Sequence, residues 1–164
     1  SAGTLDPELP LVVAECGVPY AIMHMKGLPE TMQDRPNYGN VVKEVYGYLE
    51  ERCEEFRELG IRQLMVDPGF GFGKHIKHNY QLLQHLSVFA ELGHPVLAGV
   101  SRKSMIHKVL DCTSAEALNG TTALHAWALE RGVHWLRVHD VRPAVECIRL
   151  HQYLRAAASE WNDD

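Results

Sequence analysis

The stretch 67–74 (DPGFGFGK) is the part of this sequence whose residue types and spacing most clearly suggest chemistry. Three glycines stand at every second position, directly after the apolar run 64–66, and Asp67 heads the stretch. Glycine allows backbone conformations closed to other residues and a close approach to a ligand, so the pattern predicts a ligand-binding loop at a strand end. A connector in which Asp67 only forms a turn explains the same residues equally well.

The ligand that suits this loop is a hydrogen-bond donor rather than a phosphate. The loop has neither the Gly-x-Gly-x-x-Gly spacing of dinucleotide sites nor the Gly-Lys-Ser/Thr end of a P-loop. The Asp67 carboxylate would repel a phosphate, but it accepts hydrogen bonds from an amino-substituted nitrogen ring. Phe70 and Phe72 share one side of the loop if it is extended, where they either stack on such a ring or anchor the loop.

A second group of polar residues follows two later apolar runs. The stretch 101–104 (SRKS) offers hydroxyl groups, two cations and free backbone N–H groups ahead of a helix, a combination able to bind an anion. A solvated, capped helix start is the simpler interpretation of the same stretch. Arg137 lies within an apolar strand, where an unpaired charge is costly, and His139 lies on the same face two residues later.

Methionines in the first predicted strand provide a third candidate contact. Met23 and Met25 alternate with His24, so the two thioethers share a face and the imidazole points to the other side. The thioethers would pad a flat ligand, although core packing is the more common use of methionine.

These residues must be positioned by elements that apolar periodicity and the Gly and Pro positions predict. The predicted helices are 8–16, 41–59, 82–92, 113–131 and 143–155, and the predicted strands are 19–25, 63–66, 95–100 and 135–138. Segment 26–40 is expected to be a mobile loop, and 101–110 a short amphipathic turn. Asp67, Ser101 and His139 therefore fall at strand ends, where parallel α/β proteins bind ligands.

The alternation of strands and helices predicts an α/β protein with a parallel sheet. Two architectures fit, a small doubly wound sheet and four βα units that form the C-terminal half of a TIM (β/α)8 barrel. In the barrel, Met65, Leu97 and Leu136 are expected to point inward. Residues 1–164 are interpreted as a single domain in which 156–164 form a frayed tail.

Composition argues against several function classes. A net charge of −5 and a pI near 6.0 disfavour binding to nucleic acid or to anionic membranes. No apolar run approaches the roughly 20 residues of a membrane span and no signal peptide opens the chain, so a cytoplasmic location is expected. The widely spaced cysteines show no metal-binding pattern and are expected to be reduced core residues: Cys16, Cys53, Cys112 and Cys147.

Six short motifs occur in the order in which one enzyme family carries them. They are 23–27 (MHMKG), 31–33 (TMQ), 67–74 (DPGFGFGK), 99–104 (GVSRKS), 119–121 (NGT) and 137–141 (RVHDV). Through them the chain resembles dihydropteroate synthases, the enzymes of folate biosynthesis that sulfonamides target. The resemblance covers nearly the whole chain but only the second half of the family's pattern.

The resemblance implies a pterin-binding (β/α)8 barrel that condenses a 6-hydroxymethyl-7,8-dihydropterin pyrophosphate with p-aminobenzoate and releases pyrophosphate, usually with magnesium. By the motif match, Asp67 and Lys103 bind the pterin ring, Ser101 and Arg102 border p-aminobenzoate, and Arg137 and His139 hold the pyrophosphate. The remaining implied substrate-binding residues are Met25, Phe72 and Gly99. Catalytic roles fall to Lys103, Arg137 and His139, because a leaving pyrophosphate needs cations where its charge develops.

The family's pattern also includes a closing loop, an aspartate and an asparagine that no residue of this sequence matches. We therefore expect the chain alone to be inactive, and to pair either as a homodimer or with the missing N-terminal half. A pterin-dependent methyltransferase and a non-catalytic pterin-binding remnant are the alternative functions. The stretch 101–104 favours the synthase.

Overall fold

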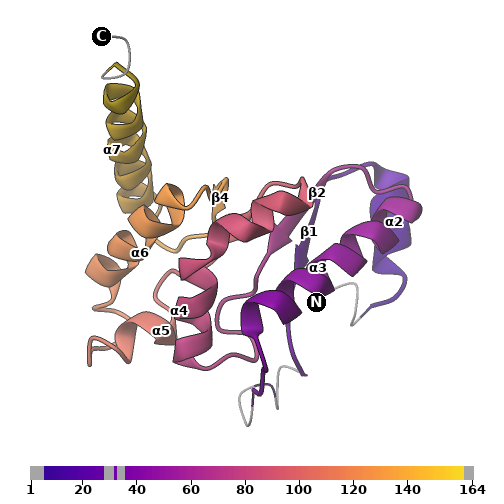
Figure 1. Cartoon of the computed structure of the whole chain (residues 1–164), viewed down its shortest axis with the longest axis horizontal. Coiled ribbons are helices and arrows are strands. Elements are labelled where there is room, and N and C mark those ends of the chain that lie inside the picture. Colours follow the sequence, from indigo (N-terminus) through magenta and orange to yellow (C-terminus); the bar gives the residue numbers. More distant parts are fainter. Residues whose placement is uncertain (1–5, 28–31, 33–35, 161–164) are drawn as a thin grey trace.

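The computed structural model describes residues 6–27, 32 and 36–160. Figure 1 shows α3 crossing in front of β1, with α4 beside α3, so α3 covers one face of the strands. The predicted alternation of strands and helices is confirmed. In chain order the elements are α2 (Leu9–Cys16), β1 (Tyr20–Met23), α3 (Val41–Glu58), β2 (Leu64–Asp67), α4 (Ile76–Gln84), the 3-10 helix η1 (Leu86–Leu92), β3 (Leu97–Ala98), α5 (Ser104–His107), α6 (Leu118–Glu130), β4 (Trp135–Leu136) and α7 (Val141–Glu160).

The strands are parallel and follow one another in space as they do in sequence. β1 pairs with β2 and β3 pairs with β4, and a bridge between Val66 and Val96 joins the two pairs. In a doubly wound sheet the strand order reverses at a switch point. Here each strand lies beside the preceding one, so the architecture is part of a (β/α)8 barrel.

Helix α3 shows how the sequence builds this layer. Its buried residues recur at helical spacing and form one stripe, and they pack beneath the helix against the strands. The side chain of Asn40 accepts a hydrogen bond from the backbone N–H of Lys43 and so caps the first turn. Each large side chain buried in this way contributes about 1.5 to 3 kcal/mol to stability. The stripe consists of Val41, Val45, Leu49, Cys53 and Phe56.

Several predicted boundaries are wrong. The helix predicted over 82–92 is two elements, α4 and the 3-10 helix η1, which together begin at Ile76. Thr113 and Glu116 make the reciprocal hydrogen bonds of a capping box, but α6 begins only at Leu118 after a turn. The last helix continues to Glu160, so the segment 156–160 expected to fray is helical, and 161–164 lie outside the described residues.

Strand register decides which side chains face away from the helix layer. Leu97 is paired with Trp135, and Ala98 is paired with Leu136. Leu136 therefore shares the helix-facing side with the fully buried Ala98, and it packs against the core. The prediction that Leu136 points inward was wrong, because the register places Trp135 there. On the opposite, inner side Met65 and Leu97 are only half-buried, and Trp135 is 58% exposed.

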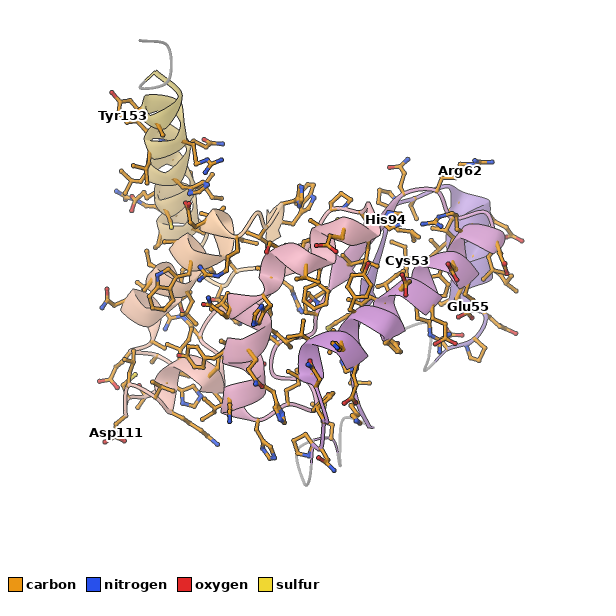
Figure 2. All side chains as sticks on the ribbon, viewed as in Figure 1. Cys53, Glu55, Arg62, His94, Asp111 and Tyr153 are labelled. Carbon is orange, nitrogen blue, oxygen red and sulfur yellow. The ribbon has the colours of Figure 1, made fainter. Side chains whose placement is uncertain are left out.

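Helix α7 contacts α6 and then runs away from the rest of the molecule (Figure 1). Tyr153 lies on this projecting part and is largely exposed (Figure 2). Among the described residues, no helix combines the length and apolar character needed to cross a membrane.

Candidate functional site

The glycine loop 67–74 is fitted closely to the end of strand β1. A Cβ atom at Gly69 would lie 1.8 Å from the carbonyl oxygen of His24, and one at Gly73 would lie 2.3 Å from that of Lys26. Both glycines also have positive φ angles, 72° and 62°. These two glycines are therefore required by contact with the protein's own backbone, whereas the sequence had suggested a close approach to a ligand.

Lys74 ends this loop and is buried against it, with its side chain turned inward. Its Nζ atom lies 2.9 Å from Nδ1 of His24 and donates to the carbonyl oxygens of Gly69 at 2.8 Å and Phe72 at 3.0 Å. Because these acceptors come from two separate segments, the ammonium group ties the glycine loop to the end of β1.

The pKa values of His24 and Lys74, which contact each other, are both lowered. Burial, reinforced by the positive charge of Lys74, lowers the pKa of His24 to about 3, so the imidazole is neutral at physiological pH. Burial lowers the pKa of Lys74 to about 7, with the Asp67 carboxylate opposing that shift and Lys103 adding to it. A neutral His24 can accept a hydrogen bond at Nδ1 from the Lys74 ammonium.

Asp67 is the last residue of β2 and is 7% exposed. Its Oδ1 atom accepts a hydrogen bond of 2.8 Å from the backbone N–H of Gly69. Burial raises the pKa of the carboxyl group, and this hydrogen bond together with the positive charge of Lys103 opposes the rise. The structure therefore places a carboxylate at the strand end, close to cations that stabilise its charge.

Lys103 reaches across from the next strand end to the glycine loop. Its Nζ donates to the carbonyl oxygen of Phe70 and lies 4.7 Å from the centre of the Phe72 ring. Burial lowers the pKa of Lys103 to about 8, Asp67 opposes this shift, and Arg137 adds to it. Phe70 is completely buried in the core, so it anchors the loop, and only Phe72 is placed to contact a ligand.

A pocket of about 280 Å³ opens at the ends of β3 and β4. It brings together six of the residues singled out from the sequence. Its lining consists of Phe72, Gly99, Ser101, Lys103, Arg137, Val138 and His139.

Arg137 is exposed on the inner side of the strands and lines this pocket. β4 ends at Leu136, so the argument that a charge inside an apolar strand must be paired does not apply to this residue. Within the described part of the chain, the guanidinium group has neither a hydrogen-bond partner nor an ion-pair partner. Arg137 thus presents to the pocket a positive charge that no direct contact engages, although its charge reaches the Asp67 carboxylate.

His139 is held by a short contact with Ser101. The Ser101 hydroxyl accepts a hydrogen bond of 3.2 Å from the backbone N–H of His139 and lies 2.9 Å from its Nδ1 atom. Because Ser101 is buried, it fixes the imidazole, which leaves the other ring nitrogen available for a ligand.

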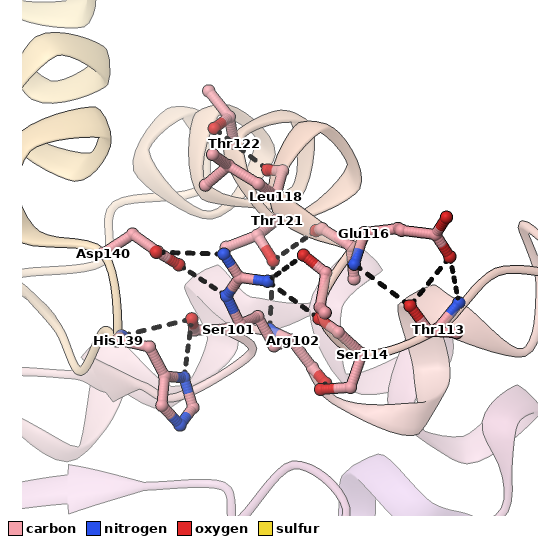
Figure 3. A network of polar contacts seen from close by, with 12 residues as sticks. Ser101, Arg102, Thr113, Ser114, Glu116, Leu118, Thr121, Thr122, His139 and Asp140 are labelled. Atoms are coloured by element: carbon pink, nitrogen blue, oxygen red, sulfur yellow. Dashed lines mark hydrogen bonds and ion pairs between the residues drawn. The ribbon is translucent and has the colours of Figure 1, made fainter.

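Arg102 has a structural place beside the pocket rather than a position in its lining. Its guanidinium donates from Nε and Nη2 to the two carboxylate oxygens of Asp140, at 2.7 and 3.0 Å, and from Nη1 to the carbonyl of Ser114 at 2.9 Å (Figure 3). This bidentate pair joins the loop after β3 to the loop after β4, and it lowers the pKa of Asp140.

Two of the backbone N–H groups that the stretch 101–104 was expected to offer to an anion are engaged within the protein. The N–H of Arg102 donates to the Thr121 hydroxyl, and the N–H of Lys103 donates to the carbonyl of Val100. The helix that follows, α5, has only four residues. Positive charge at this edge therefore comes from the side chains of Lys103 and Arg137.

Besides Arg102, two predicted site residues lie outside the pocket lining. Met25 is half-buried, and Asp67 is buried at the end of β2. Sequence reasoning gave no role to Lys74 or to the buried Asn79, whose Oδ1 accepts a hydrogen bond from the N–H of Gly71. The place of Lys74 at the end of a Gly-rich loop was the only signal for it, and Asn79 had none.

Comparison with known proteins identifies the family to which this chain belongs. A family model described as "Pterin binding enzyme" matches residues 1–139. The chain belongs to the pterin-binding enzyme family. The curated dihydropteroate synthase of Haemophilus influenzae is 44% identical over 149 residues, which are 90% of this chain and 54% of that protein. The Escherichia coli dihydropteroate synthase is 45% identical over 84% of this chain and 49% of that protein.

Solved structures of the same family share the fold. The dihydropteroate synthase of Yersinia pestis, solved with a sulfonamide drug, superimposes with a TM-score of 0.90 at 36% identity, over 93% of this chain and 56% of that one. The Thermus thermophilus enzyme, solved in complex with 6HMPPP, has a TM-score of 0.89 at 39% identity, over 93% of this chain and 62% of that one. The resemblance seen in the sequence is confirmed. The chain spans about half the length of the curated relatives it matches.

Proposed function

We propose that this chain supplies the pterin and pyrophosphate contacts of a dihydropteroate synthase, which joins a dihydropterin pyrophosphate to p-aminobenzoate. One observation carries the proposal, namely that Lys103 and Arg137 line one pocket at the strand ends, and that Lys103 also donates a hydrogen bond to the carbonyl oxygen of Phe70 in the loop headed by the buried Asp67. A carboxylate next to a pocket that is lined by cations suits a ligand that has a hydrogen-bond-donating ring and an anionic group.

The acidic side of this arrangement would bind the pterin ring. A carboxylate can accept two parallel hydrogen bonds from an amino-pyrimidine edge, and Asp67 still has acceptor capacity beyond its bond to Gly69. Phe72 would stack on the ring face, and Lys103 would donate to the ring's carbonyl side.

The cationic side would stabilise the leaving group. In the proposed reaction the p-aminobenzoate nitrogen forms a bond to the methylene carbon of the pterin, the carbon–oxygen bond breaks, and pyrophosphate leaves with the electron pair. The amine nitrogen then loses a proton to solvent. Arg137 and His139 would hold the developing negative charge, and Ser101 keeps the imidazole in position. Orientation of the amine matters more than a strong base.

The residues of this site do not themselves fit a magnesium ion. Magnesium prefers carboxylate, carbonyl and water oxygens, whereas the pocket is lined by Lys103, Arg137 and His139. Among the described residues, no group of three or more His, Cys, Asp or Glu side chains could hold a metal. Magnesium is still expected from the resemblance.

The inner side of the strands would need a cover for the site to work. Met65, Leu97 and Trp135 are not packed against the core, and eight strands normally enclose such side chains. A second copy, or the remaining half of a barrel, would bury them. The purified chain should therefore appear as a dimer or larger in light scattering and release no pyrophosphate from both substrates, whereas a stable, active monomer would refute this part of the proposal.

Two other functions would use the same pocket. A pterin-dependent methyltransferase would use the same acidic contact to the pterin. A non-catalytic remnant would bind the same ligands as the synthase but would not catalyse the reaction. The named relatives, the cationic pair of Lys103 and Arg137, and the pyrophosphate chemistry it suits all support the synthase. A cytoplasmic location is part of the proposal.

Calorimetry of pterin binding tests the assignment. Asp67→Asn in a form that contains both halves of the barrel should weaken pterin binding by about 1 to 3 kcal/mol, the range for a hydrogen bond to a charged group. Asp111→Asn is the matched control, because Asp111 is exposed at the surface (Figure 2). Pterin affinity that is unchanged in Asp67→Asn would refute the role of this carboxylate.

A further inference from the structure

A second hollow, unrelated to the strand-end pocket, lies between the start of α3 and helix α4. It has a volume of about 580 Å³ and shares no lining residue with the strand-end pocket. The helices that border it lie side by side (Figure 1). Its apolar part includes Val41, Val42 and Val88, and its rim includes Tyr38. We refer to it as the α3–α4 groove.

The α3–α4 groove is lined by lysines, which carry a positive charge, and by histidines, which become positive when protonated. Lys43, Lys77, His78 and His85 line it, and none of the described lining residues is an aspartate or a glutamate. This is unusual in a chain whose net charge is −5. Within the described part of the chain, neither lysine forms an ion pair or a side-chain hydrogen bond, so no carboxylate is paired with either ammonium group. The Glu44 carboxylate is near enough to His78 to oppose the lowering of its pKa.

The carboxylate whose charge reaches His78, that of Glu44, is already engaged by other partners. Glu44 forms an ion pair of 3.2 Å with Lys26 and accepts hydrogen bonds from the backbone N–H groups of Gly39 and Asn40. These partners lower the pKa of Glu44, although burial opposes that shift. Burial, with the charges of neighbouring His75 and lysines, lowers the pKa of His78, as expected where positive charges gather.

From this geometry we propose that the α3–α4 groove binds a small polyanion, a molecule with several adjacent phosphate or carboxylate groups. The ammonium group of Lys43 comes from α3 and that of Lys77 from α4, the imidazoles of His78 and His85 line the same hollow, and Gln81 adds an uncharged donor. Nδ1 of His78 accepts a hydrogen bond from the backbone N–H of His75, so its other ring nitrogen is the one left for a ligand. The valine floor would accept an apolar part of the same ligand. Tyr38 also contacts the glycine loop, because its hydroxyl donates to the carbonyl of Gly73 at 2.8 Å.

Nuclear magnetic resonance of the whole chain, labelled at histidine, tests the proposal with tripolyphosphate and citrate as probes. We expect the ring signals of His78 and His85 to move and saturate as the probe is added, and the pKa of His78 to rise because a bound anion favours the imidazolium. Saturation by tripolyphosphate alone identifies phosphate groups as the ligand chemistry. Saturation by both probes identifies closely spaced anionic groups of either kind.

Variants separate this groove from the strand-end pocket. Lys43→Gln combined with Lys77→Gln should weaken binding about tenfold, the expected effect of removing two partly screened charge contacts. Lys108→Gln, an exposed lysine beyond α5, is the control and should bind as the unaltered chain does. Arg137→Gln should leave the groove signals unchanged, so the outcome does not depend on the proposed synthase function. Histidine signals that neither probe moves, or a lysine double variant with full affinity, would overturn the proposal.

Discussion

The glycine loop and the two loops that follow β3 and β4 border the strand-end pocket, and they are held in place by different physical means. The glycine loop 67–74 is fixed by close backbone packing at Gly69 and Gly73 and by the buried ammonium of Lys74. The loops after β3 and β4 are joined by the Arg102–Asp140 ion pair, whose side chains are 20% and 26% exposed. Substitutions in the closely packed glycine loop should therefore cost much stability. Loss of the Arg102–Asp140 ion pair should cost less, and its contribution to stability should fall as salt is added.

The sharpest test of this contrast is Gly69→Ala. The added Cβ would lie 1.8 Å from the His24 carbonyl oxygen at a φ of +72°, so the loop or β1 must move. We expect a loss of about 3 to 5 kcal/mol from the free energy of unfolding, the combined cost of overpacking and of a left-handed backbone. Gly93→Ala is the control, because it has a similar φ of +73° with no atom within 4 Å, and it should cost only about 1 kcal/mol. Urea denaturation measures both, and equal losses would contradict the packing argument.

Lys74→Met should have the next largest effect. The variant keeps most of the side-chain volume but leaves the carbonyl oxygens of Gly69 and Phe72 and the Nδ1 atom of His24 without their donor. Unsatisfied buried acceptors should lower the free energy of unfolding by about 2 to 3 kcal/mol. Lys108→Met, at an exposed position, should change little. If denaturation shows no difference between the two variants, the ammonium does not hold the loop.

Acid should loosen the same loop through His24. The folded-state pKa of about 3 lies below the ordinary value of 6.5, so the unfolded chain binds the proton more readily between these values. The stability that neutral His24 contributes is therefore fully present above pH 6.5 and is lost as the pH falls towards 3. At about pH 5 the loss in the free energy of unfolding should be about 2 kcal/mol. The pH dependence of unfolding should be shallower over this window in His24→Asn than in the unaltered chain. Parallel pH profiles would show that His24 does not titrate as its surroundings imply.

The Arg102–Asp140 pair should give the smallest loss of stability. Its carboxylate has a lowered pKa, so the contribution is present above the ordinary range for aspartate and fades as pH falls through the lowered value. A double-mutant cycle with Arg102→Gln and Asp140→Asn should reveal a favourable coupling that shrinks when salt is added. A coupling energy as large as the loss of stability in Lys74→Met, or one that did not change with salt, would contradict the distinction between the glycine loop and the loops after β3 and β4.

Much of the site was predictable because it depends on local sequence. Parallel strands place their ends at one edge, so the positions of Phe72, Ser101, Lys103 and His139 followed once the strands had been recognised. The family was predictable from the six short motifs, through their resemblance to those of dihydropteroate synthases. Arg137 was placed correctly, but for a mistaken reason, since its side chain is exposed rather than buried.

The sequence by itself determined the alternation of strands and helices, because apolar periodicity is a local property of the chain. It also determined the family and the edge at which the polar residues gather. Only the tertiary structure decided that Gly69 serves a contact with His24, that Arg102 pairs with Asp140 and that Leu136 faces the helices. These outcomes depend on strand register and on contacts between segments far apart in the chain, and no local pattern encodes either.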